Sequence, residues 1–193
     1  MRDRHLLIGL GNPGPTYQKH RHNVGFMALS VIYDRHSGYT NWKPQSQCLV
    51  SDGRIDDQRT MLVMPQTYMN NSGHAVGALC HFYKLSATDV TVIYDDLALT
   101  AGKIKVKRGG GHGGHNGLRS LDQHIGPDYR RLRVGIGHPG DKALVHNYVL
   151  SNFSQDDKRW LDIILTAISD ELSLLVHDNE SAFVSRIMQN WVA

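Results

Sequence analysis

The stretch Leu6-Leu-Ile-Gly-Leu-Gly-Asn-Pro-Gly14 joins a short apolar run to a turn rich in glycine and proline. Its first five residues are all apolar or glycine, a pattern typical of a strand that is buried on both faces of a sheet. Similar runs recur along the chain, with helical patterns between them. Strands are expected at 47–51, 60–64, 90–94, 103–107 and 132–136, and helices over 24–32, 70–84 and beyond 160.

This alternation of strand and helix predicts an α/β fold, in which a twisted, mixed and mostly parallel β-sheet is flanked by helices on both faces. The chain has 193 residues, of which 40% are hydrophobic and 20% charged, as in globular rather than disordered proteins. Without a linker or repeat to divide it, the chain is expected to form a single domain over residues 1–193.

Charge and cysteine content narrow the class of protein. The net charge is +3 with histidine neutral, and the two cysteines cannot make a disulfide framework or a metal quartet. No apolar run reaches the ~18 residues of a membrane-spanning helix, and the apolar run after His5 is too short for a signal-peptide core. A reduced, cytoplasmic, monomeric protein without membrane contact is expected.

The glycines of the opening stretch also match a dinucleotide-binding fingerprint, G-x-G-x-x-G, and Asp34 lies where a ribose-binding acid would follow. That fingerprint requires a helix that begins within the glycine loop and presents N–H groups to a pyrophosphate. Pro13 has no N–H, and the helical pattern begins only near His22. A turn that needs glycine for its positive φ is therefore favoured. A nucleotide-dependent oxidoreductase stays as an alternative, testable by stabilisation with NAD.

Polar residues follow the end of each expected strand. Asn12 follows the first strand, Met69-Asn70 come shortly after Met64, Asp95-Asp96 follow Tyr94, and His138 follows Ile136. In open α/β sheets, sites form beyond the carboxyl ends of the strands. These polar residues are therefore expected to meet at one rim.

The segment Gly109-Gly-Gly-His-Gly-Gly-His-Asn-Gly117 lacks the GK[ST] ending of a P-loop. Its glycines allow a ligand to approach the backbone closely, and the alternative is a flexible surface loop. His112 and His115 raise the possibility of a metal site, but no cysteine or further histidine lies nearby at a ligand spacing. For Asn116, the alternative to a functional role is that it only caps a helix over 117–124.

A basic strand leads into this glycine segment. Its lysines share one face by the strand period of two, and arginines nearby add positive charge. The basic residues are Lys103, Lys105, Lys107, Arg108, Arg130, Arg131 and Arg133. Such a run is often only a solvated face, but its entry into a glycine loop favours phosphate binding.

Two histidines, His20 and His22, flank Arg21 in a polar loop before a helix. Either ring suits a general base, because the pKa of imidazole lies near neutral pH. A carboxylate such as Asp95 would orient the ring and stabilise its cation. There is no G-x-S-x-G motif and neither cysteine has a reactive context, so water is favoured as the nucleophile.

Taken together, these segments resemble the bacterial-type peptidyl-tRNA hydrolase family, in family order over roughly residues 6–150. The matching blocks are Gly9-Leu-Gly-Asn-Pro-Gly14, Tyr17, Arg21-His-Asn23, Pro65-Gln-Thr-Tyr-Met-Asn-Asn-Ser-Gly73, Asp95-Asp-Leu97, Gly109 to Gly117, and Arg131-Leu-Arg-Val-Gly-Ile-Gly-His-Pro-Gly-Asp141. The resemblance implies an enzyme that hydrolyses the ester joining a peptide to the 3′ end of tRNA, with no metal or organic cofactor.

The resemblance also implies roles for individual residues. His22 matches the catalytic base and Asp95 the aspartate that orients it. The residues implied to line the cleft and contact the substrate are Asn12, Tyr17, Met69, Asn70 and Asn116. Lys107 and Arg133 match a clamp for the 5′-phosphate of tRNA. Lys105, on the same strand as Lys107, is also expected to bind this phosphate.

Three positions depart from the family's usual pattern. Tyr94 and Ala98 replace a histidine and an acid around Asp95, and Arg108 stands where an apolar residue is common. Arg108 is expected to strengthen the attraction for phosphate. The remaining alternative is a non-catalytic RNA-binding module, which would keep the basic face but need neither His22 nor Asp95.

Overall fold

The strand β1 (His5–Gly9) lies at the centre of the sheet, between β4 (Gln58–Pro65) and β5 (Val90–Asp96), and runs parallel to both. All five of its residues are buried, as the apolar run predicts. The computed structural model describes residues 4–192, so residues 1–3 and 193 of the predicted domain lie outside the described residues.

Within the described residues, seven strands form one sheet in the order β2-β3-β4-β1-β5-β7-β6. The remaining strands are β2 (Lys43–Gln45), β3 (Cys48–Ile55), β6 (Ile104–Arg108) and β7 (Arg130–Gly135). The four central strands run parallel, whereas β2 and β3 at one edge and β6 at the other are antiparallel to their neighbours. The predicted mixed sheet is confirmed, and the basic strand is one of its edges.

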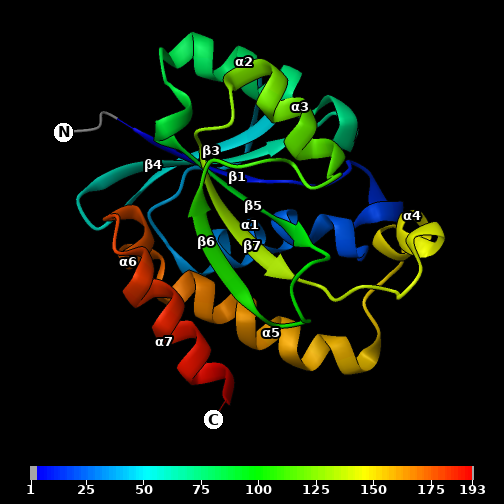
Figure 1. Ribbon diagram of the computed structural model, residues 1–193. Coiled ribbons are helices and arrows are strands. Elements are labelled where there is room, and N and C mark those ends of the chain that lie inside the picture. Colours follow the sequence, from blue (N-terminus) through cyan, green and yellow to red (C-terminus); the bar gives the residue numbers. More distant parts are fainter. Residues whose placement is uncertain (1–3, 193) are drawn as a thin grey trace.

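Helices cover both faces of this sheet, as predicted. Figure 1 shows α2 and α3 above the sheet and α5, α6 and α7 below it. The helices are α1 (Val24–Arg35), α2 (Ser72–Tyr83), α3 (Asn116–Ile125), α4 (Val145–Val149), α5 (Gln155–Asp170), α6 (Leu172–Val176) and α7 (Glu180–Val192). Successive residues of β1 serve opposite cores, because Leu6 and Ile8 join the cluster under α2 and α3 while Leu7 joins the other. None of the helices within residues 4–192 is both long and apolar enough to cross a membrane.

The glycines of the opening stretch serve helix packing more than turn conformation. A Cβ on Gly9 would lie 2.3 Å from the carbonyl oxygen of Gly25 in α1, so helix and strand could not approach as closely. Only Gly14 of the three fingerprint glycines has a positive φ, of 104°. The positive-φ explanation therefore holds for Gly14 alone. α1 begins only at Val24, so no helix begins within the glycine loop, as a dinucleotide site would require.

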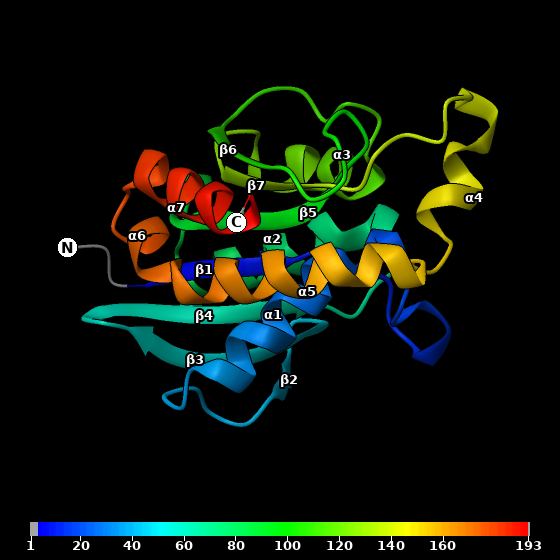
Figure 2. The same cartoon turned by 90° about the horizontal axis from the view of Figure 1, so that it is seen from below.

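The carboxyl ends of the four central strands lie on one side of the molecule. In both views α4 lies beyond the carboxyl ends of β5 and β7, apart from the other helices (Figures 1 and 2). A short 3-10 turn, Lys142–Leu144, precedes α4. Further 3-10 turns at Arg21–Asn23 and Met69–Asn71 lead directly into α1 and α2. The turn Met69–Asn71 holds two of the residues that the sequence places at the rim, Met69 and Asn70, and the turn Arg21–Asn23 holds His22.

Candidate active site

A cleft of about 1220 Å³ opens beyond the carboxyl ends of the central strands. Its lining includes all the residues predicted to meet at this rim: Asn12, Met69, Asn70, Asp95, Asp96 and His138. They come from different strand ends and are brought together by the parallel strands at the centre of the sheet. The prediction of a shared rim is therefore confirmed.

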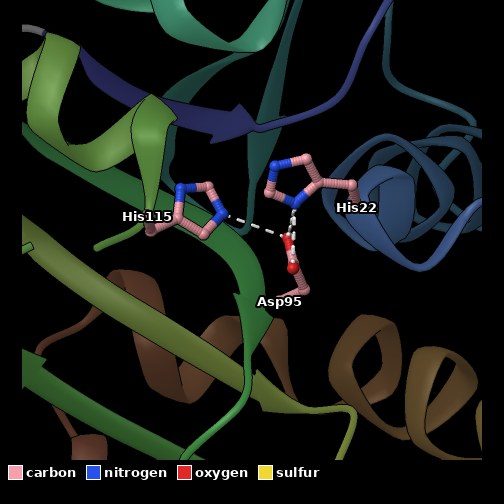
Figure 3. Close-up of side chains that lie close together, drawn as sticks. All are labelled: His22, Asp95 and His115. Carbon is pink, nitrogen blue, oxygen red and sulfur yellow. Dashed lines mark hydrogen bonds and ion pairs between the residues drawn. The ribbon is translucent and has the colours of Figure 1, made fainter. Parts of the chain in front are cut away.

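His22 and Asp95 lie in contact at the floor of this cleft. Nδ1 of His22 is 2.9 Å from each carboxylate oxygen of Asp95, and both side chains are buried. His22 lies in the 3-10 turn before α1, and Asp95 lies at the carboxyl end of β5. Figure 3 shows the second ring nitrogen of His22 pointing away from the carboxylate. His20, the other candidate base, instead packs edge-on against Tyr17.

The sequence did not reveal that His115 would join this pair. Nε2 of His115 is 3.1 Å from Oδ1 of Asp95, so two imidazoles share one carboxylate (Figure 3). Nδ1 of His115 accepts hydrogen bonds from the N–H groups of Gly117 and Leu118. His115, rather than Asn116, is thus the N-cap of α3, and Asn116 is its first residue. From the sequence, His115 is considered only as a possible metal ligand, and its capping role is missed.

The capping bonds fix the protonation of His115. Because Nδ1 accepts from two backbone N–H groups, the ring proton of neutral His115 must lie on Nε2, which donates to Asp95. Burial lowers the pKa of His115 by more than Asp95 raises it, so the ring stays neutral. Burial also lowers the pKa of His22, but the charge and hydrogen bond of Asp95 outweigh it and raise that pKa above 6.5.

Burial favours a neutral Asp95, but the two histidines oppose this effect and hold the pKa of its carboxyl well below 3.8. Asp95 is therefore a carboxylate at neutral pH, with a donor on each side. This leaves Nε2 of His22, which has no partner among residues 4–192, as the ring nitrogen available to the cleft.

His22, Asp95 and His115 are also close enough to hold a metal ion, with one ligand atom from each lying within 4.8 Å of the others. A metal would need the lone pair of Nε2 on His115, and therefore a proton on Nδ1, which would break both capping bonds to α3. The hydrogen bonds present fit a proton-carrying network better than a metal centre.

Asn12 is held rigidly at the cleft by its neighbours. Its backbone N–H donates to Oδ1 of Asn23 and its carbonyl accepts from Nδ2 of Asn23. Its side-chain Oδ1 accepts the N–H of Met69 at 2.7 Å. That bond fixes the orientation of the amide, Asn12 lines the cleft, and no hydrogen bond of its NH₂ group is found among the described residues. Asn23 belongs to the Arg-His-Asn block, but nothing in the sequence indicates its role in fixing Asn12.

The other predicted substrate-binding residues also line the cleft. Met69 is buried, whereas Asn70 and Asn116 are exposed and face the opening. Tyr17 lies edge-on to Tyr68, whose ring is 60% exposed. Tyr68 was not singled out in the sequence, although it lies within the matching block. This end of the cleft is therefore aromatic and apolar at its mouth.

Another part of the cleft is basic. Lys107 and Arg133 both line it, and the positive φ of Gly110, at 96°, carries the glycine loop past the Lys107 amine. Nε of Arg133 donates to Oδ2 of Asp96 at 2.7 Å, and this bond orients the guanidinium. Partial burial and the charges of Arg133 and Arg131 lower the pKa of Lys107, because like charges gather there. Such a cluster is suited to an anion.

The other residues of the basic run do not line the cleft. Lys105 is exposed and pairs in register with Arg133, but lies outside the cleft lining. Arg131 is wholly buried against Asp122 and donates to the carbonyl of Gly111, so it holds the glycine loop.

Arg108 and Arg130 pair with Asp178 and Glu180 on the face covered by the C-terminal helices. The expectation that Arg108 strengthens phosphate attraction is wrong, because the strand period of two turns it away from Lys107.

Comparison with known proteins agrees with this site. Residues 6–192 match the family model described as peptidyl-tRNA hydrolase. The chain belongs to the peptidyl-tRNA hydrolase family. It is 53% identical over 181 residues to the peptidyl-tRNA hydrolase of Chelativorans sp. (strain BNC1), covering 94% of this chain and 75% of that relative. Identity to the Brucella ovis protein of the same name is 49% over 187 residues, covering 94% and 74%.

Solved peptidyl-tRNA hydrolases share the fold. The crystal structure from Acinetobacter baumannii has a TM-score of 0.90 and 36% sequence identity, and the match covers 97% of this chain and 95% of that one. The resemblance seen in the sequence is therefore confirmed at the level of family and fold, and the chain is an enzyme of the peptidyl-tRNA hydrolase family.

Two departures from the family's pattern leave the contacts of Asp95 in place. Tyr94 packs edge-on against the ring of His115, with ring centroids 5.2 Å apart. The N–H of Ala98 donates to Oδ1 of Asp96, so the turn after β5 closes without an acidic side chain at 98. Asp95 keeps both histidine partners despite the changed neighbours.

Proposed function

We propose that this chain hydrolyses the ester bond between the peptide and the 3′ end of tRNA in peptidyl-tRNA, and releases free tRNA and peptide. The observation that carries the proposal is the contact between His22 and Asp95 on the floor of a cleft lined by three asparagines. Such a pair can activate water, and asparagines can bind a peptide whatever its side chains.

In this proposal His22 is the general base. Its Nδ1–H donates to Asp95, so the lone pair of Nε2 accepts a proton from water as the water oxygen attacks the ester carbonyl carbon. The resulting imidazolium is stabilised by the Asp95 carboxylate. The same proton then passes to the 3′ oxygen of tRNA as the carbon–oxygen bond breaks. No cofactor is needed for this sequence of steps.

Asn12 supplies the donor for the oxyanion. Asn12 lines the cleft, and the orientation of its amide is fixed by the bond between its Oδ1 and the N–H of Met69. A donor that is already oriented stabilises the developing negative charge without reorganising. Asn23 keeps the Asn12 backbone in place, so this donor is rigid.

Asn70 and Asn116 bind the peptide backbone or the terminal adenosine, while Tyr17 and Met69 shape the space around them. Carboxamides donate and accept hydrogen bonds without titrating, so they suit a peptide of any sequence.

Lys107 and Arg133 bind the 5′-phosphate of tRNA at the basic part of the cleft, and Lys105 adds to the attraction from its exposed position on β6. Peptidyl-tRNA is a product of translation, which places the proposed activity in the cytoplasm.

The test is release of free tRNA from a model peptidyl-tRNA by the wild-type protein and by His22→Ala. We expect kcat to fall at least ~10²-fold, within the range for a general base, with little change in binding. His20→Ala is the matched control, because this neighbouring histidine has no carboxylate partner in the site. A His22→Ala variant with near-normal kcat would refute the base. A wild-type protein that binds tRNA but releases none would indicate a binding module.

A further inference from the structure

Two distant segments of the chain form a short ladder directly beside His22. The N–H of Arg21 donates to the carbonyl of Ser151 at 3.0 Å, and the N–H of Phe153 donates to the carbonyl of Lys19 at 3.2 Å. His20 and Asn152 form the antiparallel bridge between these bonds. The turn that holds His22 is thus attached to the segment 151–153.

The side chain of Arg21 strengthens this attachment. It is 8% exposed, and Nη1 donates to Oγ of Ser151 at 2.8 Å and to the carbonyl of Asn152 at 2.5 Å. Nη2 donates to Oδ2 of Asp157, near the start of α5, at 2.7 Å. The guanidinium carbon lies 4.5 Å from the centroid of the Tyr148 ring in α4. Only a planar fork can make these contacts together, because a lysine offers one compact charge.

The segment held by Arg21 is the neck of a lobe that forms one wall of the cleft. We define this lobe as residues 137–150, which include α4 and contribute Lys142, Val145 and Val149 to the lining. The hydroxyl of Tyr148 donates to the carbonyl of Ile136 at 2.5 Å, which joins the two ends of the lobe. Figure 2 shows α4 standing clear of the sheet and reached by single stretches of chain.

We propose that Arg21 is a positioning residue that holds His22 and the neck of this lobe in one fixed arrangement. Arg21 directs its guanidinium toward the lobe and α5, away from the cleft, so it acts on the reaction through His22. The groups that face His22 itself are Asp95 from β5, His115 at the start of α3, and His20 on its own turn. The kinetic consequence of this role rests on the proposed function, but the geometric one does not.

The test compares Arg21→Met and Arg21→Lys with Arg35→Met. Arg35, the last residue of α1, likewise pairs with an acid of α5, Asp170, but this pair is exposed and lies outside the lobe, which makes Arg35 the matched control. We expect Arg21→Met to lower kcat by ~10- to 100-fold, with a smaller change in KM, as for a displaced catalytic group. Arg21→Lys keeps a positive charge near Asp157, so it should recover part of the thermal stability but not kcat. Arg35→Met should keep the wild-type kcat.

A second readout needs no substrate. NMR titration of the His22 ring in Arg21→Met should give a lower pKa than in the wild type, because the ring is no longer held against Asp95; Arg35→Met should leave it unchanged. If the wild type releases no tRNA but this shift appears, the proposed function fails and the positioning role stands. An unchanged His22 titration together with unchanged kcat in Arg21→Lys overturns the inference. An equal loss of kcat in Arg21→Met and Arg35→Met would also overturn the inference. If Arg21→Met does not fold, Arg21→Lys takes its place in both measurements.

Discussion

Nε2 of His115 lies 3.1 Å from Oδ1 of Asp95, the same oxygen that receives Nδ1–H of His22. One buried carboxylate therefore holds two imidazoles, of which only His22 keeps a ring nitrogen free for the cleft. His115 has its other nitrogen committed to the N-terminus of α3, so helix formation and the orientation of Asp95 depend on the same ring.

This double role predicts a separable effect in His115→Asn. Asparagine is a good N-cap, so the variant should keep the stability of α3 while losing the bond to Asp95. A hydrogen bond to a charged group contributes about 1.5 kcal/mol, which corresponds to a kcat about 10-fold lower. Thermal melting and steady-state hydrolysis of a model peptidyl-tRNA measure the two effects.

His115→Ala is the companion variant, because alanine removes the cap as well as the bond to Asp95. It should lose a further ~1 kcal/mol of stability relative to His115→Asn. Equal stability of the two variants would contradict the capping role, and a wild-type kcat in both would contradict the role in orienting Asp95.

The pH dependence of kcat should report the balance of forces on His22. A general base must be neutral, so kcat falls as pH drops through its pKa, and Asp95 raises that pKa above 6.5. The acidic limb of the wild type should therefore have its midpoint above pH 6.5. In Asp95→Asn the charge that raises the pKa of His22 is gone, and burial, which lowers this pKa, remains. The midpoint of the acidic limb should therefore move below pH 6.5, and the maximal kcat should also fall. An acidic limb with the same midpoint in Asp95→Asn would show that a group other than His22 determines the pH dependence of kcat.

Stability should depend strongly on Arg130, which the sequence suggested only as part of a basic surface. Its guanidinium is wholly buried and donates to the carbonyl of Leu175 and to Glu180. Arg130→Met should cost about 2–3 kcal/mol of unfolding free energy, because charged hydrogen bonds in the interior are lost. Urea denaturation measures this cost.

Arg108→Met provides the comparison for Arg130→Met. Arg108 pairs with Asp178 and Glu180, as Arg130 does, but its side chain is about a third exposed. Its loss should therefore cost less than ~1 kcal/mol of unfolding free energy. A similar cost for both variants would mean that burial of Arg130 adds nothing to its contribution.

The contrast between Arg130 and Lys107 shows how far the sequence could lead. Strand periodicity predicts which residues share a face, and strand order predicts that the ends of central strands meet, so the sheet and its polar rim were both foreseeable. Periodicity does not say whether a face is covered. Arg130 and Lys107 look alike in the sequence, but α7 covers one face and the cleft opens on the other.

Partners far apart in the chain set the roles that were missed. His115 acquires its function from Asp95 and the N-terminus of α3, and Asn23 acquires its function from Asn12. Each of these contacts depends on side-chain geometry after folding, and a single sequence carries no periodic signal for it. His22 is predicted as the base because its block resembles a known family; the residue type alone does not distinguish it from His20.

The phosphate role of Lys107 can be tested by removing the phosphate as well as the lysine. If Lys107 contacts the 5′-phosphate, Lys107→Ala should weaken binding of tRNA and lower the salt slope of log K by about 1. The same variant should bind tRNA that lacks the 5′-phosphate no more weakly than the wild type does, because the partner is already missing. Lys43→Ala, on the opposite edge strand β2, should bind both forms as the wild type does. A loss of affinity that is the same with and without the phosphate would mean that Lys107 contacts another part of the RNA, and Arg133 would then be left as the clamp.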